Sequence, residues 1–130
     1  MTNVEAHIKT EHYKTVLTNN RHEIIADEPL EANGTDLGFS PTELLCSALA
    51  ACTNITLRMY ADRKGWALEE VKTNITFERD KDQNTTHLNR QISLVGNLDE
   101  TQKARLLSIA NQCFIHKTLT NPIVVETNIH

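Results

Sequence analysis

Two cysteines of this chain have the surroundings of reactive thiols. Cys52 lies in a strongly apolar run, residues 40–53, and Cys113 lies where one helical pattern ends and a second can begin. The thiolate is the nucleophilic form of cysteine, and apolar surroundings disfavour it unless a neighbouring group lowers the thiol pKa. Two thiols that meet can convert an oxidation into a disulfide. The pair is therefore a candidate redox site, and the alternative is that each thiol is a small apolar core side chain.

The residues after Cys113 offer its thiol two kinds of partner. If residues 114–119 form a short helix, Cys113 meets the free amides of its first turn, which stabilise a thiolate. His116 lies one turn further on and could pair with Cys113, so a Cys–His hydrolase is a third hypothesis, although no orienting third group is identifiable. Cys46 lies six residues before Cys52, about 240° around a helix, and we assign it to core packing.

The first half of the chain predicts short strands followed by a long helix. Three strands are expected before a loop at residues 27–39: residues 4–9, 13–18 and 22–26. Ser40 and Glu43 have the spacing of a capping box, and Gly65 suits a helix end, which predicts a helix over residues 41–64. Most of its first half is apolar, so this helix needs cover on most sides. A chain of 130 residues can hardly supply that cover alone, which favours a partner subunit.

The second half predicts a hairpin, two helices and a closing strand. The hairpin strands are expected around residues 71–77 and 88–94, and Arg90 interrupts the apolar series of the second strand. Asp99 has the position of a helix cap, and residues 123–129 have the composition of a strand. This order of elements predicts an α+β fold in a single domain, residues 1–130.

Composition excludes several classes of function. The net charge is -4 and no basic run occurs, which argues against nucleic acid as a partner. No uninterrupted apolar stretch reaches about 18 residues, so no membrane span is expected. The odd number of cysteines and the lack of a secretory signal favour the cytoplasm. Neither a cofactor nor a metal is expected, because Cys-x-x-Cys, close histidine pairs and a glycine-rich phosphate loop are missing from the sequence.

The two cysteine motifs together resemble the OsmC/Ohr family, which groups osmotically inducible proteins with organic hydroperoxide resistance proteins. The resemblance is carried by the run at residues 40–53 and by Cys-Phe-Ile-His-Lys-Thr-Leu at residues 113–119. Asp-Glu-Pro at residues 27–29 looks most like the shorter OsmC-like branch. The resemblance implies antiparallel sheets around a long central helix, and an entwined homodimer with both active sites at the subunit interface.

The resemblance also implies a thiol peroxidase cycle. Cys52 would attack an organic hydroperoxide and become a sulfenic acid, and Cys113 would condense with it to form a disulfide. An external dithiol, often of the lipoyl type in this family, would then reduce the disulfide. The family places an activating glutamate ten residues before the first cysteine, where this chain has Thr42 followed by Glu43. It also has an activating arginine in the N-terminal half, and Arg21 is the only arginine of this chain before Cys52.

Arg21 and Glu43 are therefore the candidates for activating the thiol. We predict that Arg21 approaches Cys52 directly or through Glu43, since an unpaired thiolate in an apolar pocket is costly. The competing hypothesis is a dimeric module that binds a small ligand and has no peroxidase activity. A pKa of Cys52 below the free-cysteine value of about 8.5 would favour the enzyme.

Overall fold

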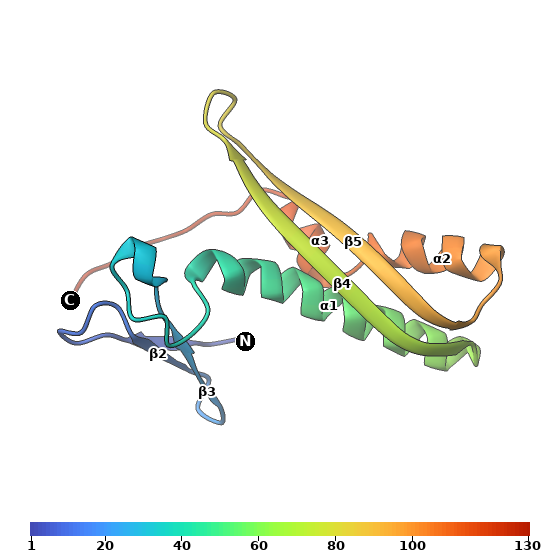
Figure 1. Cartoon of the computed structure of the whole chain (residues 1–130), viewed down its shortest axis with the longest axis horizontal. Coiled ribbons are helices and arrows are strands. Elements are labelled where there is room, and N and C mark those ends of the chain that lie inside the picture. Colours follow the sequence, from blue (N-terminus) through green and yellow to red (C-terminus); the bar gives the residue numbers. More distant parts are fainter. The chain divides into compact units, whose positions relative to one another are not determined.

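The computed structural model describes residues 1–130 (Figure 1). The chain forms two compact units, Met1–Ser47 and Ala48–His130. Strands β1, β2 and β3 form an antiparallel sheet in that order within the first unit. Its elements are β1 (Glu5–His7), β2 (Thr15–Thr18), β3 (Glu23–Ala26) and a 3-10 turn, η1 (Leu30–Ala32). The three predicted strands are confirmed, each shorter than expected. The single domain over residues 1–130 stays a prediction.

One buried carboxylate organises the loop that follows β3. Asp27 is 3% exposed, and its carboxylate accepts the backbone N–H groups of Tyr13 at 3.1 Å, Glu28 at 2.7 Å and Leu37 at 3.2 Å. It also accepts the hydroxyl and the backbone N–H of Thr35. The Thr35 hydroxyl first, and then these backbone donors, outweigh the effect of burial and hold the pKa of Asp27 well below its usual range. The sequence predicted only a loop here.

Helix α1 (Pro41–Lys64) has the predicted bounds. The Ser40 N–H donates to the Glu43 carboxylate at 2.8 Å and the Glu43 N–H donates to the Ser40 hydroxyl at 3.2 Å, which confirms the capping box. Gly65 follows the helix with φ of 70°, the left-handed conformation that suits glycine. Along α1 the buried side chains recur every four residues and so lie on one face: Leu49, Thr53, Leu57 and Ala61.

Helix α1 is also long and apolar enough to cross a membrane if length and composition alone are considered. The central helix of a globular protein meets the same two conditions, and the buried face of α1 packs against protein. The sequence-based expectation that the chain has no membrane span stays a prediction.

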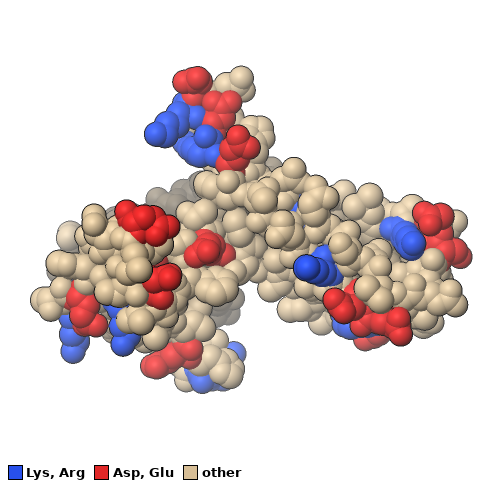
Figure 2. Space-filling view, viewed as in Figure 1, with Lys and Arg blue, Asp and Glu red and all other residues tan.

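In the second unit a long antiparallel hairpin crosses α1, and its tip extends away from the helices (Figure 1). The elements after α1 are β4 (Ala67–Asp80), β5 (Thr85–Asn97), α2 (Glu100–Ala110) and α3 (Phe114–Leu119). Even-numbered residues of β5 from 88 to 96 are half-buried and odd-numbered ones are exposed, as a one-sided strand requires. Arg90 opposes Ile75 in the register and belongs to this half-buried series. Figure 2 shows charged side chains gathered at the hairpin tip, which residues 79–82 occupy.

The core of this unit lies between the second half of α1, the base of the hairpin and α2. Seven buried apolar side chains form it: Leu57, Ala61, Leu68, Leu98, Leu106, Ile109 and Ala110. Tyr60 and Trp66 close one side with an edge-to-face contact at 5.6 Å between ring centroids. The core contains no ionisable side chain, so it holds the hairpin and α2 to α1 by apolar burial.

The end of the chain departs from the sequence-based prediction. Helix α2 begins at the predicted cap, where the Asp99 carboxylate accepts the Gln102 N–H at 2.8 Å, and α3 has the predicted bounds. The strand predicted at residues 123–129 does not form, so that prediction is wrong for the single chain. A strand needs a free sheet edge to satisfy its backbone groups, and no strand of the chain pairs with this segment. Val124 and Val125 remain 83% and 81% exposed.

Candidate active site

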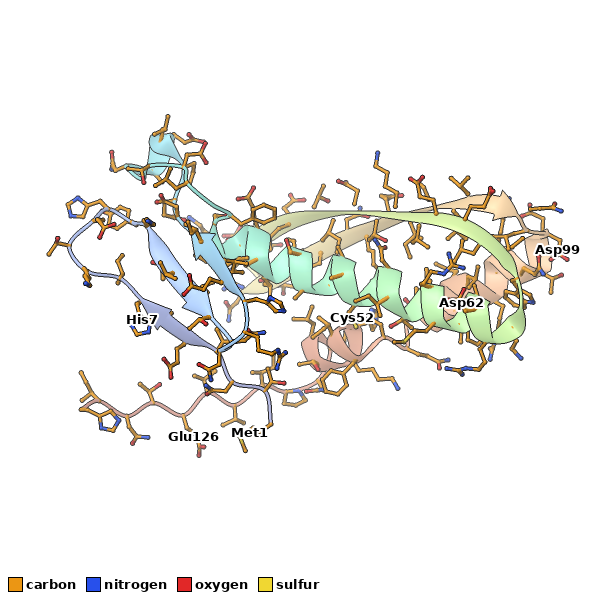
Figure 3. The ribbon with its side chains drawn as sticks, turned by 90° about the horizontal axis from the view of Figure 1, so that it is seen from below. Met1, His7, Cys52, Asp62, Asp99 and Glu126 are labelled. Atoms are coloured by element: carbon orange, nitrogen blue, oxygen red, sulfur yellow. The ribbon has the colours of Figure 1, made fainter.

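The two cysteine thiols converge on the first turn of α3. Cys113 is the residue immediately before α3, and its sulfur accepts the His116 N–H at 3.3 Å. The Cys52 sulfur accepts the Ile115 N–H at 3.5 Å. Figure 3 shows Cys52 on the side of α1 that faces α3. The expectation that Cys113 would meet the free amides of a short helix is therefore confirmed, and the same turn also serves Cys52.

Cys52 has the environment of an activated thiol. Its partial burial raises its pKa and is the largest single influence. The Ile115 N–H, the Cys113 thiol, the Thr56 hydroxyl and the Phe114 N–H together outweigh that burial, so the pKa of Cys52 is lowered below its usual value. The two sulfurs accept from the N–H groups of consecutive residues, Ile115 and His116, which places both thiols at the same turn.

Arg90 contacts residues of α1, α2 and α3 around this arrangement, a role that was not identified from the sequence. Its Nη1 donates to the Thr53 hydroxyl at 3.0 Å and to the Ala110 carbonyl at 3.3 Å. Its Nη2 donates to the Asn111 side-chain oxygen at 2.7 Å and contacts His116 Nδ1 at 3.3 Å. One guanidinium thus joins β5 to α1, to the end of α2 and to α3. The available signal was a charged residue at an inward position of an otherwise apolar strand.

His116 faces Arg90 and not the thiol of Cys113. A guanidinium has only hydrogen-bond donors, so His116 Nδ1 must accept and the ring proton must lie on Nε2. Burial first, and then the positive charge of Arg90, lower the pKa of His116 and favour this neutral form. Cys113 contacts the backbone of His116, so the geometry gives no support to the Cys–His hydrolase hypothesis.

Arg21 and Glu43 both lie in the first unit, so the structure does not place either of them relative to Cys52. Arg21 is exposed in the turn between β2 and β3, where its N–H donates to the Asn19 side chain at 3.0 Å. The Glu43 carboxylate caps its own helix, and no ion pair joins the two residues within one chain. The proposed approach of Arg21 to Cys52 stays a prediction.

Cys46 is half-buried and forms no disulfide. No three His, Cys, Asp or Glu side chains come together as a metal site would require. The chemistry that the arrangement offers is therefore that of two thiols at the first turn of α3, with the Arg90 guanidinium hydrogen-bonded to Thr53 and His116.

A model of the OsmC-like protein family matches residues 34–128, a segment that contains both thiols, Arg90 and His116. The chain belongs to this family. A search of curated proteins finds no match. Family membership accounts for the α+β arrangement of two antiparallel sheets and a long helix.

Several solved structures have the same fold as this OsmC-like chain. An OsmC-like protein from Mycoplasma pneumoniae is 21% identical with a TM-score of 0.79, over 92% of this chain and 86% of that one. An organic hydroperoxide resistance protein OsmC from Legionella pneumophila is 18% identical with a TM-score of 0.68, over 92% and 89%. The organic hydroperoxide resistance protein OhrB of Bacillus subtilis is 17% identical with a TM-score of 0.64, over 92% and 90%.

Proposed function

We propose that this OsmC-like protein is a cytoplasmic thiol peroxidase that reduces organic hydroperoxides through Cys52 and Cys113. The observation that carries the proposal is that both sulfurs accept backbone N–H groups of the first turn of α3, and such groups stabilise a thiolate. The lowered pKa of Cys52 supports this enzyme over a binding module without activity. Its similarity in fold to organic hydroperoxide resistance proteins supports a role in peroxide stress.

Exposure divides the roles of the two thiols. Cys52 is half-buried and can meet a solute, whereas Cys113 is 1% exposed and cannot do so first. The Cys52 thiolate attacks the distal peroxide oxygen; an S–O bond forms, the O–O bond breaks, and the alkoxide leaves and takes up a proton. The Cys113 thiol then attacks the sulfenic sulfur and water leaves, which gives a disulfide. An external dithiol, for which a lipoyl group is one candidate, returns two electrons and two protons to the pair.

Three single substitutions test this division of roles with cumene hydroperoxide. Cys52→Ser should abolish peroxide consumption, because serine has no sulfur that a peroxide can oxidise to a sulfenic acid. Cys113→Ser should react once and stop at a sulfenic acid that a dimedone probe labels. Cys46→Ser, the matched control, should turn over like the wild type, since Cys46 is not part of the pair. Wild-type turnover by Cys52→Ser would refute the proposal.

We further propose that the working form is a homodimer. One face of α1 carries an apolar stripe at heptad-like spacing: Leu45, Ala48, Cys52, Ile55 and Met59. Ile55 and Met59 are 55% and 61% exposed in the single chain. Apolar stripes of this kind on soluble proteins mark interaction surfaces. The unpaired apolar segment at residues 123–129 also has the composition of a strand that lacks an edge.

Sedimentation velocity measures the oligomeric state directly. The wild type should sediment as a dimer, and Ile55→Glu should weaken association about tenfold or more, because a carboxylate would be buried in an apolar contact. Ser108→Glu places the same charge at an exposed position of α2 and should leave the dimer intact. A monomeric wild type at micromolar concentration would contradict the homodimer and leave the thiol chemistry open to its own test.

A further inference from the structure

A cavity that neither thiol lines lies beside β5. Its volume is about 340 Å³, and neither Cys52 nor Cys113 lines it. Apolar side chains from α1, β5, α2 and α3 make up half of the lining residues: Leu49, Leu88, Ile92, Leu107 and Leu119. Its polar wall is formed by Arg90, His116, Asn111 and two threonines. The proposed peroxidase cycle does not use this cavity.

The charge of the cavity is positive and unbalanced. Arg90 is half-buried, and none of the residues that line the cavity is an aspartate or a glutamate. The four groups that Arg90 contacts are all neutral acceptors: the Thr53 hydroxyl, the Ala110 carbonyl, the Asn111 amide and the His116 ring. A partly buried cation without a counter-charge attracts an anion more strongly than an exposed one does.

The polar wall also has hydrogen-bond donors left over and few acceptors. Because Asn111 and His116 both accept from Arg90, the Asn111 NH₂ group and the His116 Nε2–H remain as donors. The Thr86 hydroxyl oxygen accepts from Arg79 at 2.9 Å, so its proton is also free. The Nε–H of Arg90 has no partner within the chain. Several donors from three elements therefore meet at one side of an otherwise apolar cavity.

From this juxtaposition of a donor-rich cationic wall and apolar walls, we infer that the cavity binds an amphipathic carboxylate, with the carboxylate at Arg90 and an aliphatic chain along the leucines. A carboxylate accepts several donors at once and balances the guanidinium charge. The apolar walls favour a chain over a bare anion such as acetate, because burial of aliphatic carbon contributes to binding. Neither thiol lines the cavity and the proposed peroxidase cycle does not use it, so the inference goes beyond the proposed function.

Calorimetric titration with three probes tests both halves of the inference on the reduced wild-type protein. Octanoate should bind about tenfold or more tightly than octanol, which has a similar chain and no charge, and more tightly than acetate. Arg90→Gln should weaken octanoate binding about tenfold or more. Lys72→Gln removes an equal charge from the exposed face of β4 and should leave binding unchanged. Equal affinity for octanoate and octanol would overturn the carboxylate assignment.

A second pair of variants guards against misfolding, since Arg90 also joins several elements. Leu107 lines the cavity yet is 60% exposed, so substitutions there should leave the fold intact. Leu107→Glu places a negative charge at the cavity and should weaken octanoate binding about tenfold, whereas the similarly sized and neutral Leu107→Gln should weaken it much less. Equal effects of the two variants would overturn the inference. So would the absence of octanoate binding by the wild type, as expected if a second copy of the chain fills the cavity.

Discussion

The two ends of the second unit are stabilised by different interactions, although α1, β4 and β5 run through both. At one end Leu57, Ala61 and Leu106 are fully buried in an apolar core that contains no ionisable side chain. At the other end a half-buried arginine makes four contacts with neutral acceptors, beside two thiols and a cavity. The apolar end is stabilised by close packing, and the thiol end by a polar network.

The difference indicates how a small protein can keep a reactive group without losing its fold. A closed core excludes water and disfavours charge, so a thiolate placed there would be destabilised. At the thiol end, Cys52 keeps partial access to solvent while backbone N–H groups lower its pKa. The apolar end fixes the hairpin on α1, and that fixed position brings Arg90 to Thr53 and His116.

The largest effect on stability is expected at the apolar end. Leu57 is fully buried, so Leu57→Ala should lower the free energy of unfolding by about 3 kcal/mol through lost burial and the resulting cavity. Leu107→Ala removes the same atoms from a side chain that is 60% exposed, and should cost less than about 1 kcal/mol. Urea denaturation measures both. Similar losses from the two variants would remove the contrast between a packed core and an open thiol end.

A smaller effect is expected from one hydrogen bond of the polar network. The Thr53 hydroxyl donates to the Leu49 carbonyl at 2.7 Å and accepts from Arg90, whereas the Thr118 hydroxyl donates to the Phe114 carbonyl at 2.9 Å without such a partner. Thr53→Val should therefore lower the free energy of unfolding by about 1–2 kcal/mol, and Thr118→Val by less.

The rate of Cys52 alkylation should separate the two threonine variants as well. Thr53→Val releases one of the contacts that hold Arg90 beside the thiol end, so the rate should change in that variant and stay at the wild-type level in Thr118→Val. If both variants lose the same stability and react alike, the Arg90 contact with Thr53 contributes nothing measurable.

The smallest effect is a dependence of stability on pH that originates at the thiol end. The fold lowers the pKa of His116, so the unfolded chain takes up a proton at a higher pH than the folded chain. Stability should therefore fall as pH falls below about 6.5, the usual histidine pKa, because protonation there favours the unfolded chain. His116→Gln keeps a side-chain acceptor for Arg90 and should flatten the profile between pH 7.5 and 5.5. Parallel profiles would place the pH dependence elsewhere.

Local signals in the sequence predicted most of the elements. Both capping boxes lie within four consecutive residues, at Ser40 and at Asp99, so α1 and α2 were found with their starts. The position of Cys113 before α3 also follows from its immediate neighbours. Each of these features depends on residues that are close in sequence, where spacing alone determines which groups meet.

Features that depend on distant residues were missed. The contacts of Arg90 join residues 20 to 37 positions away, and their recognition requires the register of β5 against the helices. The strand predicted at residues 123–129 has suitable side chains, yet a strand forms only by pairing with another strand, and none of the five strands of the chain pairs with this segment. For the loop at residues 27–39, the sequence shows a segment rich in turn-forming residues. It does not show that backbone N–H groups from several positions donate to the Asp27 carboxylate.

The Asp27 loop has a consequence for how this segment can vary in length between related proteins. The backbone N–H groups after β3 that donate to the Asp27 carboxylate belong to Glu28, Thr35 and Leu37. The residues between Glu28 and Thr35 therefore form a separate excursion of the loop, and Leu30 at its tip is 68% exposed. Insertions at this tip lengthen the excursion without moving a donor. Between Thr35 and Leu37, one added or deleted residue would bring the wrong amide to the carboxylate. Length changes should therefore be tolerated at the tip of the loop and rejected at its base.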